Sequence, residues 1–247
     1  MEDFKLVILT ALGVGGATVF GSLIGFFVKG IPPRLSGLTL SFAGGIMLSA
    51  AIWGLMIPAI GEGGPFAITL SSSGILSGAV FIGVCQRLVP KLRFMAGDGF
   101  ENGEADRVLC LVMAMAVHNF PEGVAAGVSL GSHDLGGALA VAGGIALQNI
   151  PEGMAVIPPM LSAGIKRRRA LALALVTGAT EVAGTFFGYR AVTLLEPVLP
   201  FALSFAGGAM LFVIVDGMIP EASEAGKGSA YVFCLGFCAM LFMSLVL

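Results

Sequence analysis

The sequence predicts an all-α integral membrane protein with eight transmembrane helices. Hydrophobic residues make up 57% of the chain and charged residues only 11%, whereas about 25% of the residues of a soluble domain are charged. The mean hydropathy is +0.98. Glycine occurs 37 times, and small residues allow helices in a membrane to pack closely. These three observations exclude an ordinary soluble domain and favour a helical bundle in a bilayer.

Eight apolar segments are long enough to cross a bilayer, which takes about 20 helical residues. They are residues 5–28, 35–60, 68–90, 107–131, 135–162, 169–190, 199–220 and 229–247. Glycine and proline separate them, as at Pro32-Pro33 and Gly63-Gly64-Pro65, because proline cannot continue a helix. No connection is long enough for a second domain, so we expect residues 1–247 to form one transmembrane domain.

The basic residues predict how the helices are oriented. Most Lys and Arg residues lie in the odd-numbered connections, including the run 166–169, while Lys5 and Arg190 lie on the other side. Cytoplasmic connections carry the excess of Lys and Arg. We therefore expect a multi-pass protein of the plasma (inner) membrane with both termini outside the cytoplasm. The N-terminus lacks a basic signal-peptide start, so the first apolar segment is expected to remain as a helix.

Net charge and cysteine content indicate no further chemistry. The net charge of -2 gives no indication of a nucleic-acid partner. The four cysteines, Cys85, Cys110, Cys234 and Cys238, fall in apolar segments without metal-finger spacing. A free buried cysteine behaves as a small hydrophobic residue, so we expect these residues to contribute to packing.

An internal repeat links the second and seventh segments. Residues 41–48 (Ser-Phe-Ala-Gly-Gly-Ile-Met-Leu) recur as residues 204–211 (Ser-Phe-Ala-Gly-Gly-Ala-Met-Leu). The two segments run through the membrane in opposite directions, and such inverted repeats are typical of secondary transporters. Convergence of glycine-rich helices is the alternative. The repeat predicts a 3+2+3 arrangement, in which helices 1–3 (about 5–90) and 6–8 (169–247) surround central helices 4 and 5 (about 107–162).

Each central helix carries the pattern x-Asn-x-Pro-Glu-Gly, at 118–123 and at 148–153. A carboxylate at membrane depth is costly unless it faces a partner or a cavity, so it indicates a functional site. The first and fifth residues of each motif are four positions apart and share a helix face. The proline of each motif removes one helical hydrogen bond and frees a carbonyl oxygen.

The two motifs supply one imidazole, two carboxylates and several amide oxygens, and the sixth predicted helix adds a third carboxylate. These donors suit a divalent first-row metal, and the absence of thiolates argues against copper(I). The alternatives are a histidine that only makes an interhelical hydrogen bond, a kink whose acid snorkels to the interface, or two acids that share a proton. Two copies of the motif and the third carboxylate favour a metal site. The candidate ligands are His118, Asn119, Glu122, Gln148, Asn149, Glu152 and Glu181.

The motifs at 118–123 and 148–153 resemble the signature fourth and fifth helices of the ZIP (Zrt/Irt-like) divalent metal transporter family, most closely its bacterial GufA-like branch. The resemblance extends over the whole chain through the eight helices and their 3+2+3 arrangement. It implies a homodimer in the lipid bilayer, in which helices 1, 4, 5 and 6 move as an elevator against helices 2, 3, 7 and 8. The chain departs from many family members at Asn149, where they carry an acidic residue or a histidine.

The resemblance also implies a binuclear metal site at mid-membrane. Its first metal position would be formed by His118, Gln148, Asn149 and Glu152. Its second would be formed by Asn119, Glu122, Gln148, Glu152 and Glu181, so that Gln148 and Glu152 bridge the two. Met47 in the second helix matches a possible methionine ligand, although a methionine in a packed apolar helix is commonly a core residue. No cofactor is expected beyond the transported metal.

The predicted function is the import of a divalent metal ion, first of all Zn²⁺, into the cytoplasm. The same donors accept Fe²⁺, Mn²⁺, Co²⁺ and Cd²⁺, so they do not identify the metal. One alternative is a proton-conducting or structural membrane protein that uses the carboxylates as a relay. The other is an intramembrane metalloprotease, which normally needs two histidines in one set. The only histidines, His118 and His133, lie on different elements, so we expect no enzymatic activity.

Several polar residues lie near the predicted helix ends. His133 and Asp134 are expected in a surface turn between helices 4 and 5. The acidic residues near the outer end of helix 2 and the cytoplasmic end of helix 7 either draw cations towards the site or are interfacial acids without a transport role. These acidic residues are Glu62, Asp216, Glu221 and Glu224.

Overall fold

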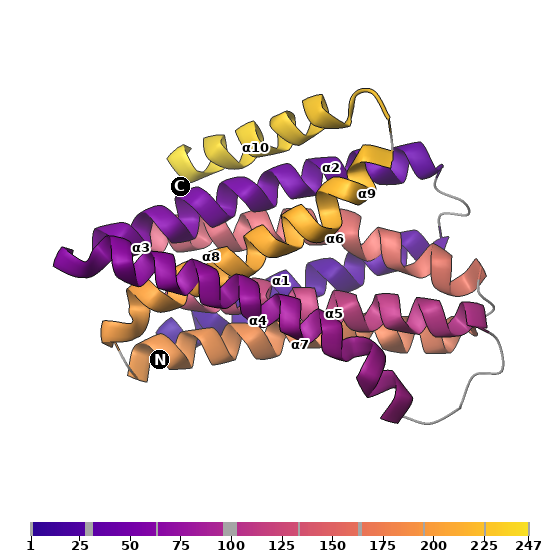
Figure 1. Ribbon diagram of the computed structural model, residues 1–247, viewed down its shortest axis with the longest axis horizontal. Coiled ribbons are helices and arrows are strands. Elements are labelled where there is room, and N and C mark those ends of the chain that lie inside the picture. The colour runs from indigo at the N-terminus through magenta and orange to yellow at the C-terminus, as the bar shows by residue number, and fades with distance from the viewer. Residues whose placement is uncertain are drawn as a thin grey trace.

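The computed structural model describes residues 2–27, 32–62, 64–95, 103–132, 134–162, 165–194, 196–224 and 226–246, and every regular element in this part of the chain is helical. Eight long helical segments lie side by side along the long axis of the molecule (Figure 1). They are α1 (Glu2–Phe27), α2 with α3 (Pro33–Ser49 and Ile57–Glu62), α4 (Ala67–Met95), α5 (Gly103–Leu130), α6 (Leu135–Ser162), α7 (Arg167–Leu194), α8 with α9 (Leu199–Val213 and Ile219–Glu224) and α10 (Ser229–Val246). The prediction of an all-α fold with eight helices is confirmed.

Six segments in the described part of the chain are long and apolar enough to cross a membrane. They are Phe4–Phe27, Arg34–Gly61, Gly64–Leu88, Arg167–Leu194, Leu199–Met218 and Ser229–Val246. Each of the central helices α5 and α6 carries its polar six-residue motif within an apolar sequence.

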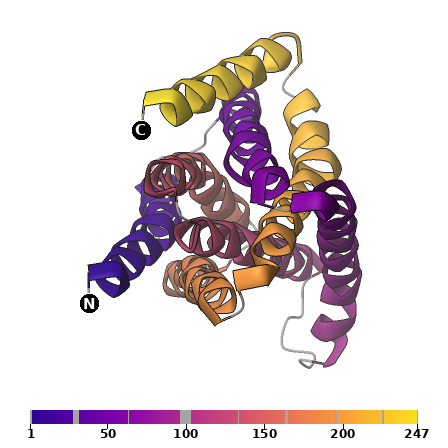
Figure 2. The same cartoon turned by 90° about the vertical axis from the view of Figure 1, so that its left-hand side faces the viewer.

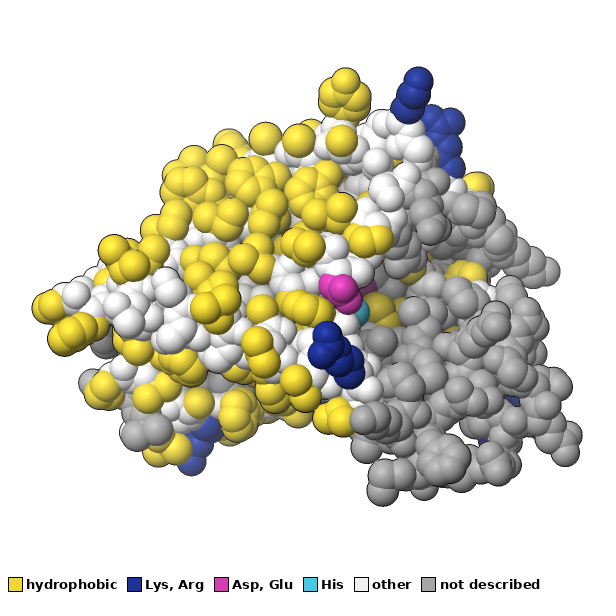
Figure 3. Space-filling model, in the orientation of Figure 1, with side chains coloured by type: hydrophobic (Ala, Val, Ile, Leu, Met, Phe, Trp, Pro, Cys, Tyr) yellow, Lys and Arg dark blue, Asp and Glu magenta, His cyan; other side chains and the backbone are white. Residues whose placement is uncertain are grey.

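The outer surface is apolar. Hydrophobic side chains are spread widely over the described surface visible in Figure 3, whereas Lys and Arg appear at its upper right and lower left and, beside an acidic side chain, near the centre of the view. Large hydrophobic residues such as Leu9, Ile68, Leu76, Phe187 and Phe242 are each more than half exposed. Several polar side chains are instead buried inside the bundle. An apolar exterior around a polar interior is the pattern of a helical membrane protein, because lipid solvates apolar side chains and leaves polar groups to pair internally.

The helices pack in a regular set of pairs. Helix α5 packs along α7 and α1 along α6, while α4 packs along α8 and α2 along α10; α1 also packs against α7. The two central helices α5 and α6 contact each other, and they connect the α1–α7 pair to α2 and α8. Helix α1 begins and α10 ends at the same end of the bundle (Figures 1 and 2).

Two helices pass through a short π-helical stretch. Ala50–Met56 joins α2 to α3, and Ile214–Met218 joins α8 to α9. Each stretch begins a few residues after one copy of the repeated sequence, 41–48 or 204–211. A π-helical stretch widens the helix locally and is frequent at functional sites. Ala50–Met56 packs against both central helices, and Gly217 of the second stretch lies beside His118 of α5.

Candidate metal centre

The two motif helices stay helical through their prolines. Helix α5 continues over Pro121 and α6 over Pro151, so the polar residues of each motif keep helical spacing. Of the motif side chains, Asn119, Glu122, Gln148 and Asn149 are at most 1% exposed. The motifs therefore place amides and carboxylates in the interior of the bundle, away from the apolar outer surface.

The glycine after each motif carboxylate allows two helices to touch. A Cβ atom at Gly123 would collide with the backbone carbonyl of Glu181 on α7, and one at Gly153 would collide with the carbonyl of Thr18 on α1. Close backbone approach at small residues is how membrane helices pack. The glycines thus set the positions of α7 and α1 next to the two motifs, a packing role that the sequence pattern did not reveal.

The carboxylate of Glu181 is held by three donors from three different helices. Its Oε1 accepts hydrogen bonds from Thr18 Oγ1 and Asn119 Nδ2, both at 2.5 Å. Its Oε2 accepts one from Asn149 Nδ2 at 2.6 Å. Glu181 is fully buried. This carboxylate therefore joins α1, α5, α6 and α7 at one point in the interior.

The carboxylate of Glu122 is less completely satisfied. Its Oε1 accepts a hydrogen bond from Gln148 Nε2 at 2.9 Å. Among the described residues no donor reaches four buried oxygen atoms of the predicted ligands. These atoms are Asn119 Oδ1, Glu122 Oε2, Gln148 Oε1 and Asn149 Oδ1. A buried polar atom without a partner costs free energy, and a cation is the partner that suits four oxygen acceptors at once.

Glu152 belongs to the same region. It is 6% exposed, and its carboxylate interacts electrostatically with those of Glu122 and Glu181. Three acidic side chains near one another repel when ionised, and a bound cation relieves that repulsion. In the part of the chain that the structure describes, no three His, Cys, Asp or Glu side chains form a group that could hold a metal ion by themselves.

His118 points to a different neighbour. Its Nε2 lies 2.6 Å from Nε2 of Gln86 on α4, so the amide donates to the unprotonated ring nitrogen. Asp216 interacts electrostatically with the ring, and Gly217 lies beside it. The imidazole is thus next to α4 and the π-helical stretch at 214–218. Sequence reasoning missed Gln86, although an amide within an apolar helix is a signal that identifies it.

Of the other predicted residues, the structure describes Met47, Asp134 and Asp216. Met47 is fully buried in the hydrophobic core with Ile46, Leu55 and Met210. Asp216 is exposed, and the side chains of Glu62, Glu221 and Glu224 lie outside the described residues, as does His133. Asp134 is exposed and accepts a hydrogen bond from the backbone N–H of Gly137 at the start of α6, which agrees with a surface turn.

The cysteines differ from the prediction that they serve packing. Cys234 and Cys238 on α10 are free and exposed, and Cys85 is half-buried. Helix α10 packs mainly against α2, so its opposite face is uncovered in this chain and carries these two cysteines. Cys110 lies outside the residues with described side chains.

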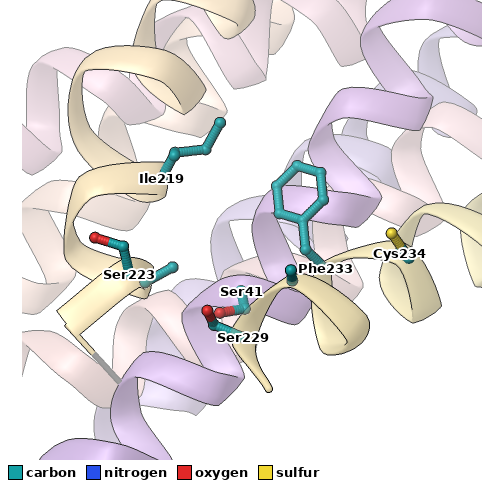
Figure 4. Close-up of a pocket in the computed structure, with 8 residues that line it drawn as sticks. Ser41, Ile219, Ser223, Ser229, Phe233 and Cys234 are labelled. Carbon is teal, nitrogen blue, oxygen red and sulfur yellow. The ribbon is translucent and has the colours of Figure 1, made fainter. Parts of the chain in front are cut away.

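A separate pocket opens between α2, α9 and α10 (Figure 4). It has a volume of about 320 Å³. Hydroxyl groups of Ser41, Ser223 and Ser229 and the apolar side chains of Ile219 and Phe233 lie around it (Figure 4). None of the described side chains that line it is charged. This pocket therefore offers no charged ligand for a cation among its described lining residues.

Comparison with known proteins gives a consistent set of relatives. The family model for ZIP zinc transporters matches residues 101–244. The zinc transporter GufA of Myxococcus xanthus is 36% identical over 226 residues, which cover 89% of each chain. The zinc transporter ZIPB of Bordetella bronchiseptica is 30% identical over 240 residues, 94% of this chain and 78% of the relative. The human zinc transporter ZIP11 is 29% identical over 316 aligned positions, 92% of each chain.

Proposed function

The chain belongs to the ZIP zinc transporter family, and we propose that it imports zinc into the cytoplasm through a metal centre between α5, α6 and α7. The family consists of transporters, so the alternative of an intramembrane metalloprotease is discarded. One observation carries the proposal: four buried oxygen atoms of the motif side chains have no donor among the described residues, beside three carboxylates. A Zn²⁺ ion supplies the missing partner for the oxygens and compensates the carboxylate charge.

The proposed centre has two metal positions. The first uses His118, Gln148, Asn149 and Glu152, and the second uses Asn119, Glu122, Gln148, Glu152 and Glu181. Gln148 is well suited to join them, because its Nε2 donates to Glu122 while its Oε1 has no donor among the described residues. Binding at the first position requires His118 to leave Gln86 or to bind through Nδ1, since Nε2 already accepts a hydrogen bond. Met47 on α2 is a further candidate ligand, although it is packed among core residues.

The proposed architecture is one transmembrane domain with inverted repeats around α5 and α6. The helix pairs support it: exchanging α1 with α7 and α5 with α6 converts the α1–α6 pair into the α7–α5 pair. Exchanging α2 with α8 and α10 with α4 likewise converts the pair of α2 and α10 into the pair of α8 and α4. The two π-helical stretches, at 50–56 and 214–218, also occupy corresponding places.

The grouping of the helix pairs supports transport by an elevator movement. Helices α1, α5, α6 and α7 pack mainly with one another, and α2, α4, α8 and α10 form a second group. We propose that the first group carries the ion and the second, as a homodimer, forms the fixed scaffold in the inner membrane. Both chain termini then lie outside the cytoplasm, as the Lys and Arg distribution predicts.

Zinc uptake into proteoliposomes tests the function. The wild-type protein should show saturable uptake, and Glu152→Ala or His118→Ala should reduce it strongly while the proteins remain folded. Competition with Fe²⁺, Mn²⁺, Co²⁺ and Cd²⁺ identifies the preferred metal, because the donor types alone accept all of them. Unchanged zinc flux in Glu152→Ala would contradict the proposal. Proton flux that occurs without metal and does not respond to zinc would favour the relay alternative.

A further inference from the structure

Helices α1 and α7 share a sequence pattern at a constant offset of 163 positions. Six positions are identical in the two helices. The matching pairs are Ala11 and Ala174, Leu12 and Leu175, Gly15 and Gly178, Val19 and Val182, Gly21 and Gly184, and Gly25 and Gly188. In this alignment Thr18 corresponds to Glu181. Two helices that share their small residues at one spacing are expected to pack in the same way.

The contacts of the two helices are mirrored in the structure. A Cβ atom at Gly15 would meet the carbonyl oxygen of Gly178 and the side chain of Val182, and one at Gly178 would meet the carbonyl oxygen of Gly15 and the side chain of Val19. Helices α1 and α7 therefore cross at equivalent glycines, and each presents the same residue types to the other.

The contacts with the motif helices are mirrored as well. Asn119 on α5 donates to the backbone carbonyl of Thr177 at 3.4 Å, and Asn149 on α6 donates to that of Val14 at 3.3 Å. Val14 and Thr177 are again 163 positions apart. A twofold relation thus exchanges α1 with α7 and α5 with α6, and it places Thr18 and Glu181 at equivalent points of the interior.

The chemistry at these two equivalent points is not the same. One is a neutral hydroxyl and the other a carboxylate, and Thr18 Oγ1 donates to Glu181 Oε1 at 2.5 Å. Thr18 is 2% exposed, and its backbone carbonyl is the atom against which Gly153 packs. The hydroxyl is therefore fixed next to the second motif, at the contact between α1 and α6.

We propose that Thr18 is a positioning residue for zinc binding, which acts through Glu181. This inference rests on the proposed function. The hydroxyl directs Oε1 towards α1, and Asn149 holds Oε2 towards α6, so the plane of the carboxylate is set before an ion arrives. Donors that orient a ligating carboxylate commonly change metal affinity about 10–100-fold when they are removed.

The test compares Thr18→Val, which removes the hydroxyl and keeps the shape, with Thr18→Ser, which keeps the hydroxyl. Thr185→Val is the matched control, because the buried Thr185 hydroxyl donates only to the backbone carbonyl of Glu181 within its own helix. For each variant, titration calorimetry gives the dissociation constant for zinc. Uptake into proteoliposomes gives the KM and the maximal rate of zinc transport. Thr18→Val should raise Kd and KM about 10–100-fold with a smaller change in maximal rate. Thr18→Ser and Thr185→Val should remain near wild type.

A double-mutant cycle separates positioning from general damage. If Thr18 acts through Glu181, adding Thr18→Val to Glu181→Gln should leave Kd within about twofold of Glu181→Gln alone, because residues that act in series are not additive. The inference is overturned if Thr18→Val binds zinc with the wild-type Kd, or if Thr185→Val loses as much zinc affinity as Thr18→Val. It is also overturned if the double variant binds zinc more weakly than Glu181→Gln alone by more than this margin. If Thr18→Val does not fold, Thr18→Ala is used in the same cycle. Failure of wild-type protein to bind or take up zinc would instead reject the proposed function.

Discussion

Gln148 on α6 donates from its Nε2 to Glu122 Oε1 on α5, 2.9 Å away, and the remaining oxygen of each side chain has no donor among the described residues. The two motifs are thereby joined by one hydrogen bond between their helices. The two free oxygens and those of Asn119 and Asn149 are the acceptors that a cation can satisfy. This relationship joins the polar motifs of α5 and α6 in the centre that we propose for zinc.

Replacing Glu122 should change stability and zinc binding in opposite directions. Glu122→Gln removes one of three neighbouring acidic groups from the interior, so without zinc the variant should unfold at a higher temperature than wild type. Zinc affinity should fall by more than about 100-fold, because removing a residue that only orients a ligand already costs about 10–100-fold. Thermal unfolding with and without zinc measures both effects. A variant that zinc stabilises as strongly as wild type would show that Glu122 is not a ligand.

The glycines after the motif carboxylates should be intolerant of a methyl group. Gly123→Ala and Gly153→Ala place a Cβ atom on a neighbouring backbone carbonyl, and overpacking of this kind costs about 1–3 kcal/mol. Gly16→Ala is the matched control in α1, because no atom lies within 4 Å of its added Cβ. The midpoint of thermal unfolding in detergent should fall for the first two variants only. Equal midpoints for all three would contradict the helix contacts.

Gln86 should restrain His118. The amide of Gln86 occupies Nε2 of the imidazole, so a metal that uses this nitrogen must displace a hydrogen bond worth about 0.5–1.5 kcal/mol. Gln86→Ala should therefore lower the zinc Kd by up to about tenfold, whereas His118→Ala should raise it. Calorimetric titration of both variants distinguishes them. Weaker binding in Gln86→Ala would mean that the amide aids the metal rather than competing with it.

Zinc uptake should decrease as the external pH is lowered. Carboxylates and imidazole bind metal only when deprotonated, so protons compete with zinc for the same groups. The KM for zinc should rise between about pH 7.5 and pH 5.5, and proton release should accompany binding in a weakly buffered solution. An unchanged KM over this range, with no proton release, would contradict direct ligation by these residues.

The sequence was sufficient to predict the helices and the motif side chains that lie buried between them. Apolar length predicted eight helices, and helical spacing placed the polar residues of each motif on one face, because both follow from local geometry. Thr18 and Gln86 were missed, since their roles depend on which helices cross. Thr18 meets Glu181 from 163 positions away, and no spacing within one helix reveals such a contact. The position of His118 beside α4 depends in the same way on helix packing.

The location of bound zinc tests the central claim most directly. Crystals of the wild-type protein grown with zinc can be measured at the zinc absorption edge, where anomalous scattering marks the metal alone. The predicted result is anomalous density in the interior between α5, α6 and α7, within ligand distance, about 2.0–2.2 Å, of Glu122, Gln148 and Glu152. Density found only at other positions, such as beside Asp216 or in the pocket between α2 and α10, would contradict the account.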